Sequence, residues 1–282
     1  MLNPNEIFIS ENSNIILVEG IDKFNFFQGI ISNDIEILKK KPSIYCSLLT
    51  PQGKFQYDFF ITNHGNKFYV ECHKNYQKEL FQKLLMYKLR SDIKITLDQN
   101  WLTVLTKKKL LDVHKPDLIS FDDPRFDNFF SRSYLKSDLL KVVQEKFTVI
   151  GKDYFESLRL SLSIPDFSVD AIKEKSLLLE MRFDDLNGIS WTKGCFMGQE
   201  ITARMKYRNI VKKKLFKVII NYNTELNNEI FLDNKVIGQL LSHNKKEGLA
   251  FLNTEILKNQ KSSNLISGDS LIKVEVPWWV KS

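Results

Sequence analysis

The 282-residue chain has few of the side chains that build disulfide frameworks or metal centres. Its three cysteines lie far apart and show no CxxC or Cys/His ligand spacing: Cys46, Cys72 and Cys195. Its four histidines form no triad or ligand pattern, and we expect them at the surface or in turns: His64, His73, His114 and His243. The sequence therefore predicts reduced thiols, a cytoplasmic location and no resident metal.

Other classes of protein are also disfavoured by what is missing. No apolar run approaches membrane-spanning length, and the first residues show no basic region followed by an apolar core. No tandem repeat stands out. Neither GxGxxG nor GxxxxGK[ST] occurs, so the sequence gives no support for a nucleotide site.

What is present is the composition of an ordinary globular protein, with 43% hydrophobic and 27% charged residues. The net charge of +7 permits an anionic partner. A basic run follows residue 205, and no aromatic side chains of a stacking platform are interleaved with it. We therefore interpret this run as a solvated linker rather than a nucleic-acid track: Lys206, Arg208, Lys212, Lys213, Lys214 and Lys217.

Hydrophobic periodicity predicts an α+β region followed by an all-β unit. Alternating apolar residues predict strands near residues 7–9, 14–18, 93–95 and 102–105, and a three-stranded meander over 44–73. Helical spacing predicts a helix capped by Asp22 and helices over 74–90 and 151–162. After Arg208 the pattern changes to short alternating strands. We place a domain boundary near residue 210, with domains at 1–210 and 211–282.

Several stretches occur in the order expected of one family. The chain resembles the YgfZ-type folate-binding proteins, relatives of the glycine-cleavage T-protein (aminomethyltransferase). The most specific match is K-G-C-aromatic-x-G-Q-E, found at residues 193–200, which T-proteins lack. The resemblance covers nearly the whole chain and rests on these segments: LVEGIDKFNFFQGIISNDI, LLTPQGKFQYDFFI, YKLRSDIKI, DPR, LRLSLSIPD and GISWTKGCFMGQEITARMKYR.

The resemblance implies a cloverleaf of α/β subdomains around a central tetrahydrofolate site, with a C-terminal β-barrel. The first 210 residues would then form two interleaved folate-binding subdomains. It also implies a role in assembling or maintaining iron–sulfur enzymes, including those that modify tRNA. The expected partners are folate and, transiently, iron–sulfur proteins or cluster carriers.

Cys195 is the thiol with the strongest functional interpretation. It precedes a helix that we expect to begin near Gly198, and Lys193 lies two residues away. A helix N-terminus and an ammonium both favour the thiolate, the form that attacks or binds metal. A single cysteine cannot hold a cluster stably, so we expect transient or shared ligation. Cys46 and Cys72 lie in strand-like patterns and are expected to be buried.

Other site residues follow from the resemblance. Asp58 matches the T-protein aspartate that contacts the reacting folate nitrogen, although Tyr57 replaces the acid that commonly precedes it. Phe155 would stack on the pterin and Arg159 would meet a carboxylate; a second pterin aromatic of some relatives falls near Ser13, which is not aromatic. On the motif helix, the residues expected to serve folate's glutamate tail or an anionic partner are Gln199, Glu200 and Arg204.

Three functional hypotheses remain open at this point. The first is a folate-binding accessory factor for iron–sulfur proteins, acting through Cys195. The second is a folate-dependent aminomethyl or one-carbon transferase that uses Asp58. The third is a basic RNA-binding module, which would bind with a steep dependence on salt concentration.

Overall fold

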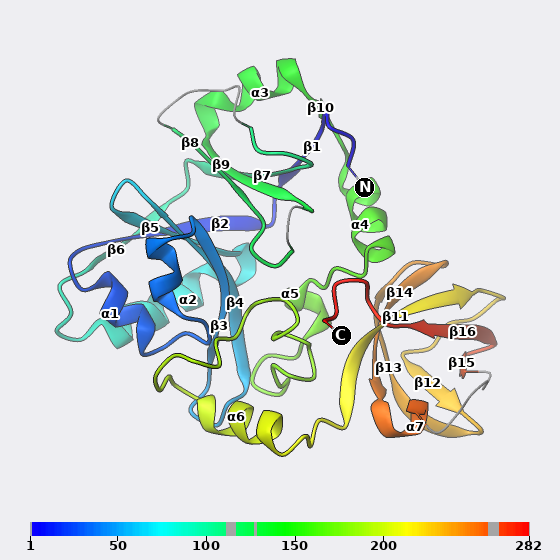
Figure 1. Cartoon of the computed structure of the whole chain (residues 1–282). Coiled ribbons are helices and arrows are strands. Elements are labelled where there is room, and N and C mark those ends of the chain that lie inside the picture. The colour runs from blue at the N-terminus through cyan, green and yellow to red at the C-terminus, as the bar shows by residue number, and fades with distance from the viewer. Residues whose placement is uncertain (1, 111–116, 127–128, 259–264, 282) are drawn as a thin grey trace.

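The computed structural model describes residues 2–110, 117–126, 129–258 and 265–281, so His114 lies outside the described residues. The chain forms two five-stranded sheets and a closed six-stranded barrel. In Figure 1 the helix α4 (Lys152–Ser161) runs between the upper sheet and the barrel. None of the described helices is both long enough and apolar enough to cross a membrane.

The first sheet contains the predicted meander. Its strand order is β3-β4-β5-β2-β6, and all neighbouring strands are antiparallel. A two-residue turn joins β4 to β5; both its residues, Gly65 and Asn66, have positive φ, as a type I′ hairpin turn requires. The strands are β2 (Ser13–Glu19), β3 (Ser43–Leu49), β4 (Phe55–His64), β5 (Lys67–His73) and β6 (Lys94–Asp98).

Helices cover one face of this sheet and enclose a core of aliphatic and aromatic side chains. They are α1 (Lys23–Gln28), the 3₁₀ helix η1 (Ile35–Lys39) and α2 (Lys74–Lys88). Leu80 and Leu84 of α2 are fully buried, as their spacing predicts. Asp22 does precede α1, but its carboxylate accepts a hydrogen bond from the Asp92 backbone amide instead of capping the helix.

The second sheet has the order β10-β1-β7-β9-β8 and packs against the other face of the first. Seven buried side chains from the two sheets, among them Tyr69, Trp101 and Tyr134, form the core between them. The strands are β1 (Glu6–Ser10), β7 (Trp101–Thr106), β8 (Leu118–Asp122), β9 (Ser131–Lys136) and β10 (Thr148–Val149). Two short helices accompany this sheet: η2 (Ser137–Leu139) and α3 (Leu140–Lys146).

The C-terminal barrel closes in the order β11-β14-β13-β12-β15-β16 and is filled by alternating aliphatic side chains. Because the barrel is closed, its described strands present no long unpaired edge. The elements are β11 (Lys213–Asn221), β12 (Glu229–Leu232), β13 (Lys235–His243), β14 (Glu247–Asn253), α7 (Thr254–Lys258), β15 (Leu265–Ser267) and β16 (Ser270–Glu275).

A central core joins the sheets to the barrel. Most of residues 171–198 have no regular secondary structure, yet Met181, Phe183 and Leu186 are fully buried there. Two helices border this segment, α5 (Phe167–Asp170) and α6 (Gln199–Tyr207). The C-terminal tail returns from the barrel to this core (Figure 1). Trp279 of the tail is buried there, and its indole donates to the Ser163 carbonyl.

Candidate functional site

A cavity of about 550 Å³ lies where the two sheets meet α4 and α5. Its walls come from segments far apart in the sequence: the β1–β2 turn, β4, the end of β5, β9 and α4. This volume falls within the roughly 300–1,000 Å³ of small-molecule and cofactor sites. Because the cavity is large enough for a small molecule and several buried charged side chains line it, it is a candidate binding site.

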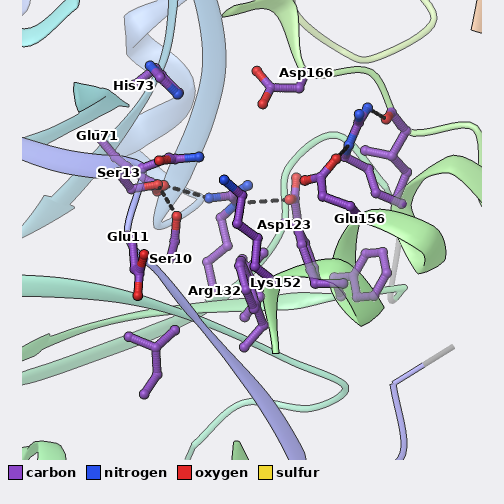
Figure 2. A pocket seen from close by; sticks show the side chains of 18 of the residues that line it. Ser10, Glu11, Ser13, Glu71, His73, Asp123, Arg132, Lys152, Glu156 and Asp166 are labelled. Carbon is purple, nitrogen blue, oxygen red and sulfur yellow. Dashed lines mark hydrogen bonds and ion pairs between the residues drawn. The ribbon is translucent and has the colours of Figure 1, made fainter. Parts of the chain in front are cut away.

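A buried row of charges crosses one side of the cavity. The Arg132 guanidinium donates hydrogen bonds to Glu71 at 2.7 Å and to Asp123 at 2.9 Å. The Arg125 guanidinium donates two further hydrogen bonds to the Asp123 carboxylate. Figure 2 shows Arg132 between the two carboxylates. Burial opposes ionisation of Asp123, but the two guanidinium groups outweigh it and hold its pKa well below the ordinary range. Within the row, the charges of two carboxylates and two guanidinium groups balance.

Asp58 provides the cavity with a carboxyl group of a different kind. The Tyr45 hydroxyl donates to it at 2.7 Å, and no cation pairs with it among the described residues. Burial raises the pKa of Asp58 to about 6, and the nearby Asp166 carboxylate acts in the same direction. A group that titrates there can exchange a proton with a ligand near neutral pH.

His73 also lines the cavity, which corrects the expectation that all four histidines are surface or turn residues. It follows the last buried residue of β5 and is half-buried. Burial lowers its pKa, so the imidazole is mostly neutral at pH 7. In Figure 2, His73 and Asp166 lie on opposite sides above the charged row.

An aromatic pair forms another part of the wall. The rings of Phe8 and Phe155 stack with centroids 3.8 Å apart and planes 3° from parallel, and both line the cavity. Phe155 is thus in the cavity, but one of its faces is already covered by Phe8. Ser13 lines the cavity too, and its hydroxyl pairs with that of Ser10.

Arg159 lies at the cavity wall but is bound to internal partners. Its guanidinium donates to Glu156, Asp170, the Ile164 carbonyl and the Ser242 hydroxyl of the barrel. The side chain is buried, so these bonds join α4, α5 and the barrel. The predicted pairing of Arg159 with a ligand carboxylate stays a prediction, and in this structure the guanidinium connects the barrel to the core.

The motif around Cys195 forms a separate exposed loop. Cys195 is exposed, whereas Cys46 and Cys72 are buried as predicted. The helix α6 begins at Gln199, and Gly198 precedes it with φ of 78°. The Gln199 side chain accepts a hydrogen bond from the Phe196 amide, which closes the loop on itself.

Lys193 fixes this loop to α1. Its ammonium donates to three backbone carbonyls, those of Gln28, Ile31 and Asn33, at 2.7–2.9 Å. Burial lowers the pKa of Lys193 to about 8. Sequence proximity suggested that this ammonium serves the thiolate, but its hydrogen bonds go to the end of α1 and position the loop.

The predicted site residues therefore divide into two groups. Asp58, Phe155 and Arg159 line the cavity, whereas the motif residues do not: Lys193, Cys195, Gln199, Glu200 and Arg204. Glu200 and Arg204 are exposed on α6, and their side chains make no hydrogen bond or ion pair with other described residues. Arg204 thus lies on the helix that follows the thiol's loop and does not line the cavity.

Sequence reasoning missed several cavity residues because they carry no motif. Glu71 and Arg132 lie within ordinary strand patterns 61 residues apart and meet only through sheet packing. Asp123 and Arg125 belong to the DPR segment, but nothing in that segment indicates their partner Arg132. A charged side chain at an inward position of a strand was the one available signal.

Comparison with known proteins defines the class of fold. The structure aligns with glycine cleavage system aminomethyltransferase T from Bartonella henselae over 98% of this chain and 86% of the other, with a TM-score of 0.80. At 13% sequence identity, this likeness concerns the fold alone. Residues 212–282 match the family model of the CAF17 C-terminal beta-barrel domain. The predicted T-protein-like α+β fold with a C-terminal barrel is confirmed.

The similar curated proteins are described as mitochondrial IBA57 homologs, iron–sulfur cluster assembly factors. The Neurospora crassa protein is 27% identical over 93% of this chain and 62% of its own length. The Dictyostelium discoideum protein is 26% identical over 75% of this chain and 62% of its own. The chain thus spans about 60% of the length of these relatives.

The mitochondrial location of these relatives contradicts the predicted cytoplasmic location, which is wrong. The physical reason is that a low cysteine count indicates a reducing compartment without saying which one.

Proposed function

We propose that this chain is a tetrahydrofolate-binding accessory factor of the YgfZ type, which supports assembly or repair of iron–sulfur enzymes, tRNA-modifying ones among them. The relatives described as iron–sulfur cluster assembly factors support the iron–sulfur half of the proposal. The T-protein-like fold and its central cavity support the folate half.

The observation that carries the proposal is the presentation of Cys195. It is the one exposed thiol of the three, on a loop held by the Lys193 hydrogen bonds and by the packing of Gly198. Fixing the loop limits the entropy lost when a partner or cluster binds the sulfur. A single thiolate is one ligand, so the cluster is cargo held jointly with a partner protein.

The cavity residues fit a reduced folate in three respects. The Phe8–Phe155 pair offers apolar contact for a ring, and Asp58 can accept hydrogen bonds from ring nitrogens when ionised. Lys152 lines the cavity and is exposed, and its side chain makes no hydrogen bond or ion pair with other described residues, so its ammonium can meet a glutamate tail. Bound tetrahydrofolate would supply a carrier for one-carbon units.

Calorimetric titration with reduced folates tests this half directly. We expect saturable binding that Phe155→Ala weakens by roughly 1–3 kcal/mol, through lost stacking and apolar burial. Tyr154→Ala is the matched control, because this neighbour on α4 is exposed and does not line the cavity. If the wild-type protein shows no heat of binding at millimolar folate, the proposed folate binding is wrong.

Activity measurements in cells test the iron–sulfur half. Deleting the gene should lower the activity of iron–sulfur enzymes, while enzymes without clusters in the same extracts keep theirs. Normal activity of the iron–sulfur enzymes after deletion would contradict the proposed role.

A second candidate, a folate-dependent transferase, is favoured by one observation. The pKa of Asp58 near 6 suits a group that accepts and returns a proton at physiological pH. Turnover of a methylamine-bearing donor in the presence of tetrahydrofolate, lost in Asp58→Asn, would establish this candidate. Folate binding without turnover would leave the accessory role.

A further inference from the structure

The helix α6 and the residues after it carry cationic side chains that have no partner among the described residues. Arg204, Arg208 and Lys212 are exposed, and none has a side-chain hydrogen bond or ion pair with another described residue. Lys206 differs, since it pairs with Asp184 at 3.0 Å. Of the three free cations, Arg204 lies on α6, Arg208 caps its C-terminal end, and Lys212 lies in the segment that follows.

The same segment exposes large apolar side chains. Tyr207 is 77% exposed and Ile210 is 47% exposed, whereas Thr202 is buried and Met205 packs in the central core. Packing of the fold thus accounts for the buried side of α6 but not for the exposed tyrosine. Tyrosine and arginine together are the side chains enriched at the energetic centres of protein interfaces.

We propose that this α6 surface, formed by Arg204, Tyr207, Arg208, Ile210 and Lys212, is a docking site for an acidic protein partner. Within the proposed function, on which this inference rests, the partner is the protein that shares the cluster with Cys195. The surface begins nine residues after Cys195, on the helix that directly follows the thiol's loop, so the docking site and the thiol belong to one continuous segment of the chain. Carboxylates on the partner meet the cations, and an apolar group meets Tyr207.

The side chains of the α6 surface favour a protein over single-stranded RNA as the binding partner. RNA-binding grooves of this kind stack successive bases on several aromatic rings, and Tyr207 is the one aromatic side chain of this surface. The exposed Glu200 stands between Cys195 and the cations in the sequence, and it would repel a continuous phosphate backbone that ran along this segment. A folded partner can place its acidic groups on the cations and avoid Glu200.

Fluorescence anisotropy with two anionic probes tests the inference on the full chain. The first probe is a labelled amphipathic peptide of glutamate and leucine, and the second is labelled poly(U). We expect the triple variant Arg204→Ala/Arg208→Ala/Lys212→Ala to bind the peptide roughly tenfold or more weakly. Tyr207→Ala should weaken it by roughly fivefold.

A charge-matched control separates a specific surface from general basicity. Lys40, Lys41 and Lys235 are exposed elsewhere, and Lys40→Ala/Lys41→Ala/Lys235→Ala removes the same charge. This control should change the peptide affinity by less than roughly twofold. An equal loss in the control, no effect of Tyr207→Ala, or tighter binding of poly(U) than of the peptide would each overturn the inference.

The Cys195→Ser variant distinguishes a failure of the docking surface from a failure of the proposed function. This variant should bind the peptide with unchanged affinity, because the surface does not include the thiol. If the peptide fails to bind while Cys195 is still required in cells, the docking surface is wrong and the proposed function stands. If the peptide binds and Cys195 proves dispensable, the proposed function fails instead.

Discussion

Gly53 and Gly198 pack against each other, which joins the β3–β4 turn to the loop that carries Cys195. A Cβ atom on Gly198 would lie 3.1 Å from the Cα of Gly53, and one on Gly53 would lie 2.8 Å from the carbonyl oxygen of Gly198. Both glycines have positive φ. Two segments that lie far apart in the sequence, PQGK and KGCFMGQE, are therefore parts of one close-packed contact.

Gly198→Ala should disrupt this contact. The left-handed backbone alone costs a side chain roughly 1–2 kcal/mol, and the clash with the β3–β4 turn adds to that. Thermal unfolding should show a lower Tm, and support of iron–sulfur enzymes should fall. Gly194→Ala is the control, because a Cβ there meets no atom within 4 Å. Equal Tm values for the two variants would contradict the packing argument.

Arg132→Met should be among the most destabilising substitutions in the chain. It leaves Glu71 buried without its cation and removes one of the two cations from Asp123, a loss of roughly 3–5 kcal/mol for a broken buried pair. Urea unfolding measures the change. Lys67→Met, which breaks the exposed pair with Glu19, should cost at most about 1 kcal/mol. An effect of Arg132→Met as small as that of Lys67→Met would contradict the predicted cost of breaking the buried pairs.

Asp58 should give the protein a characteristic pH dependence. Its pKa is about 6 in the folded protein, against an ordinary value of 3.8 that applies to the unfolded chain, so between these values the folded protein binds more protons. The unfolding free energy therefore falls as the pH rises from 3.8 to 6. Urea unfolding should show the wild type losing stability relative to Asp58→Asn across this window. A constant difference between the two proteins would mean that Asp58 titrates normally.

The sequence predicted the features that depend on neighbouring residues, and it did not predict those that depend on contacts between residues far apart in the chain. Strands and helices with regular periodicity, such as β4 and α2, were predictable because local alternation determines which face is buried. The irregular core around Met181 and Phe183 has no period and depends on what surrounds it. The partners of Arg159 and Lys193 were unpredictable for the same reason, since the Ser242 hydroxyl and the Gln28 carbonyl lie far away in sequence.

The three thiols should differ in reactivity. Burial raises the pKa of both Cys46 and Cys72 and shields them, whereas Cys195 is exposed. Alkylation of the folded protein at neutral pH should therefore modify Cys195 first, and mass spectrometry of the peptides identifies the site. The control is the same reaction in denaturant, where the three thiols should react alike. Faster modification of Cys46 or Cys72 in the folded protein would contradict the exposed loop.

The central claim is that the Cys195 sulfur itself supports iron–sulfur enzymes, and complementation of deletion cells tests it most directly. Cys195→Ser changes little in volume at an exposed position, so folding and folate binding should remain near wild type. Cys72→Ser controls for the loss of a thiol at a position that lines the cavity instead. The account predicts that iron–sulfur enzyme activity is restored by the wild type and by Cys72→Ser, but not by Cys195→Ser. Full restoration by Cys195→Ser, at equal protein levels, would contradict it.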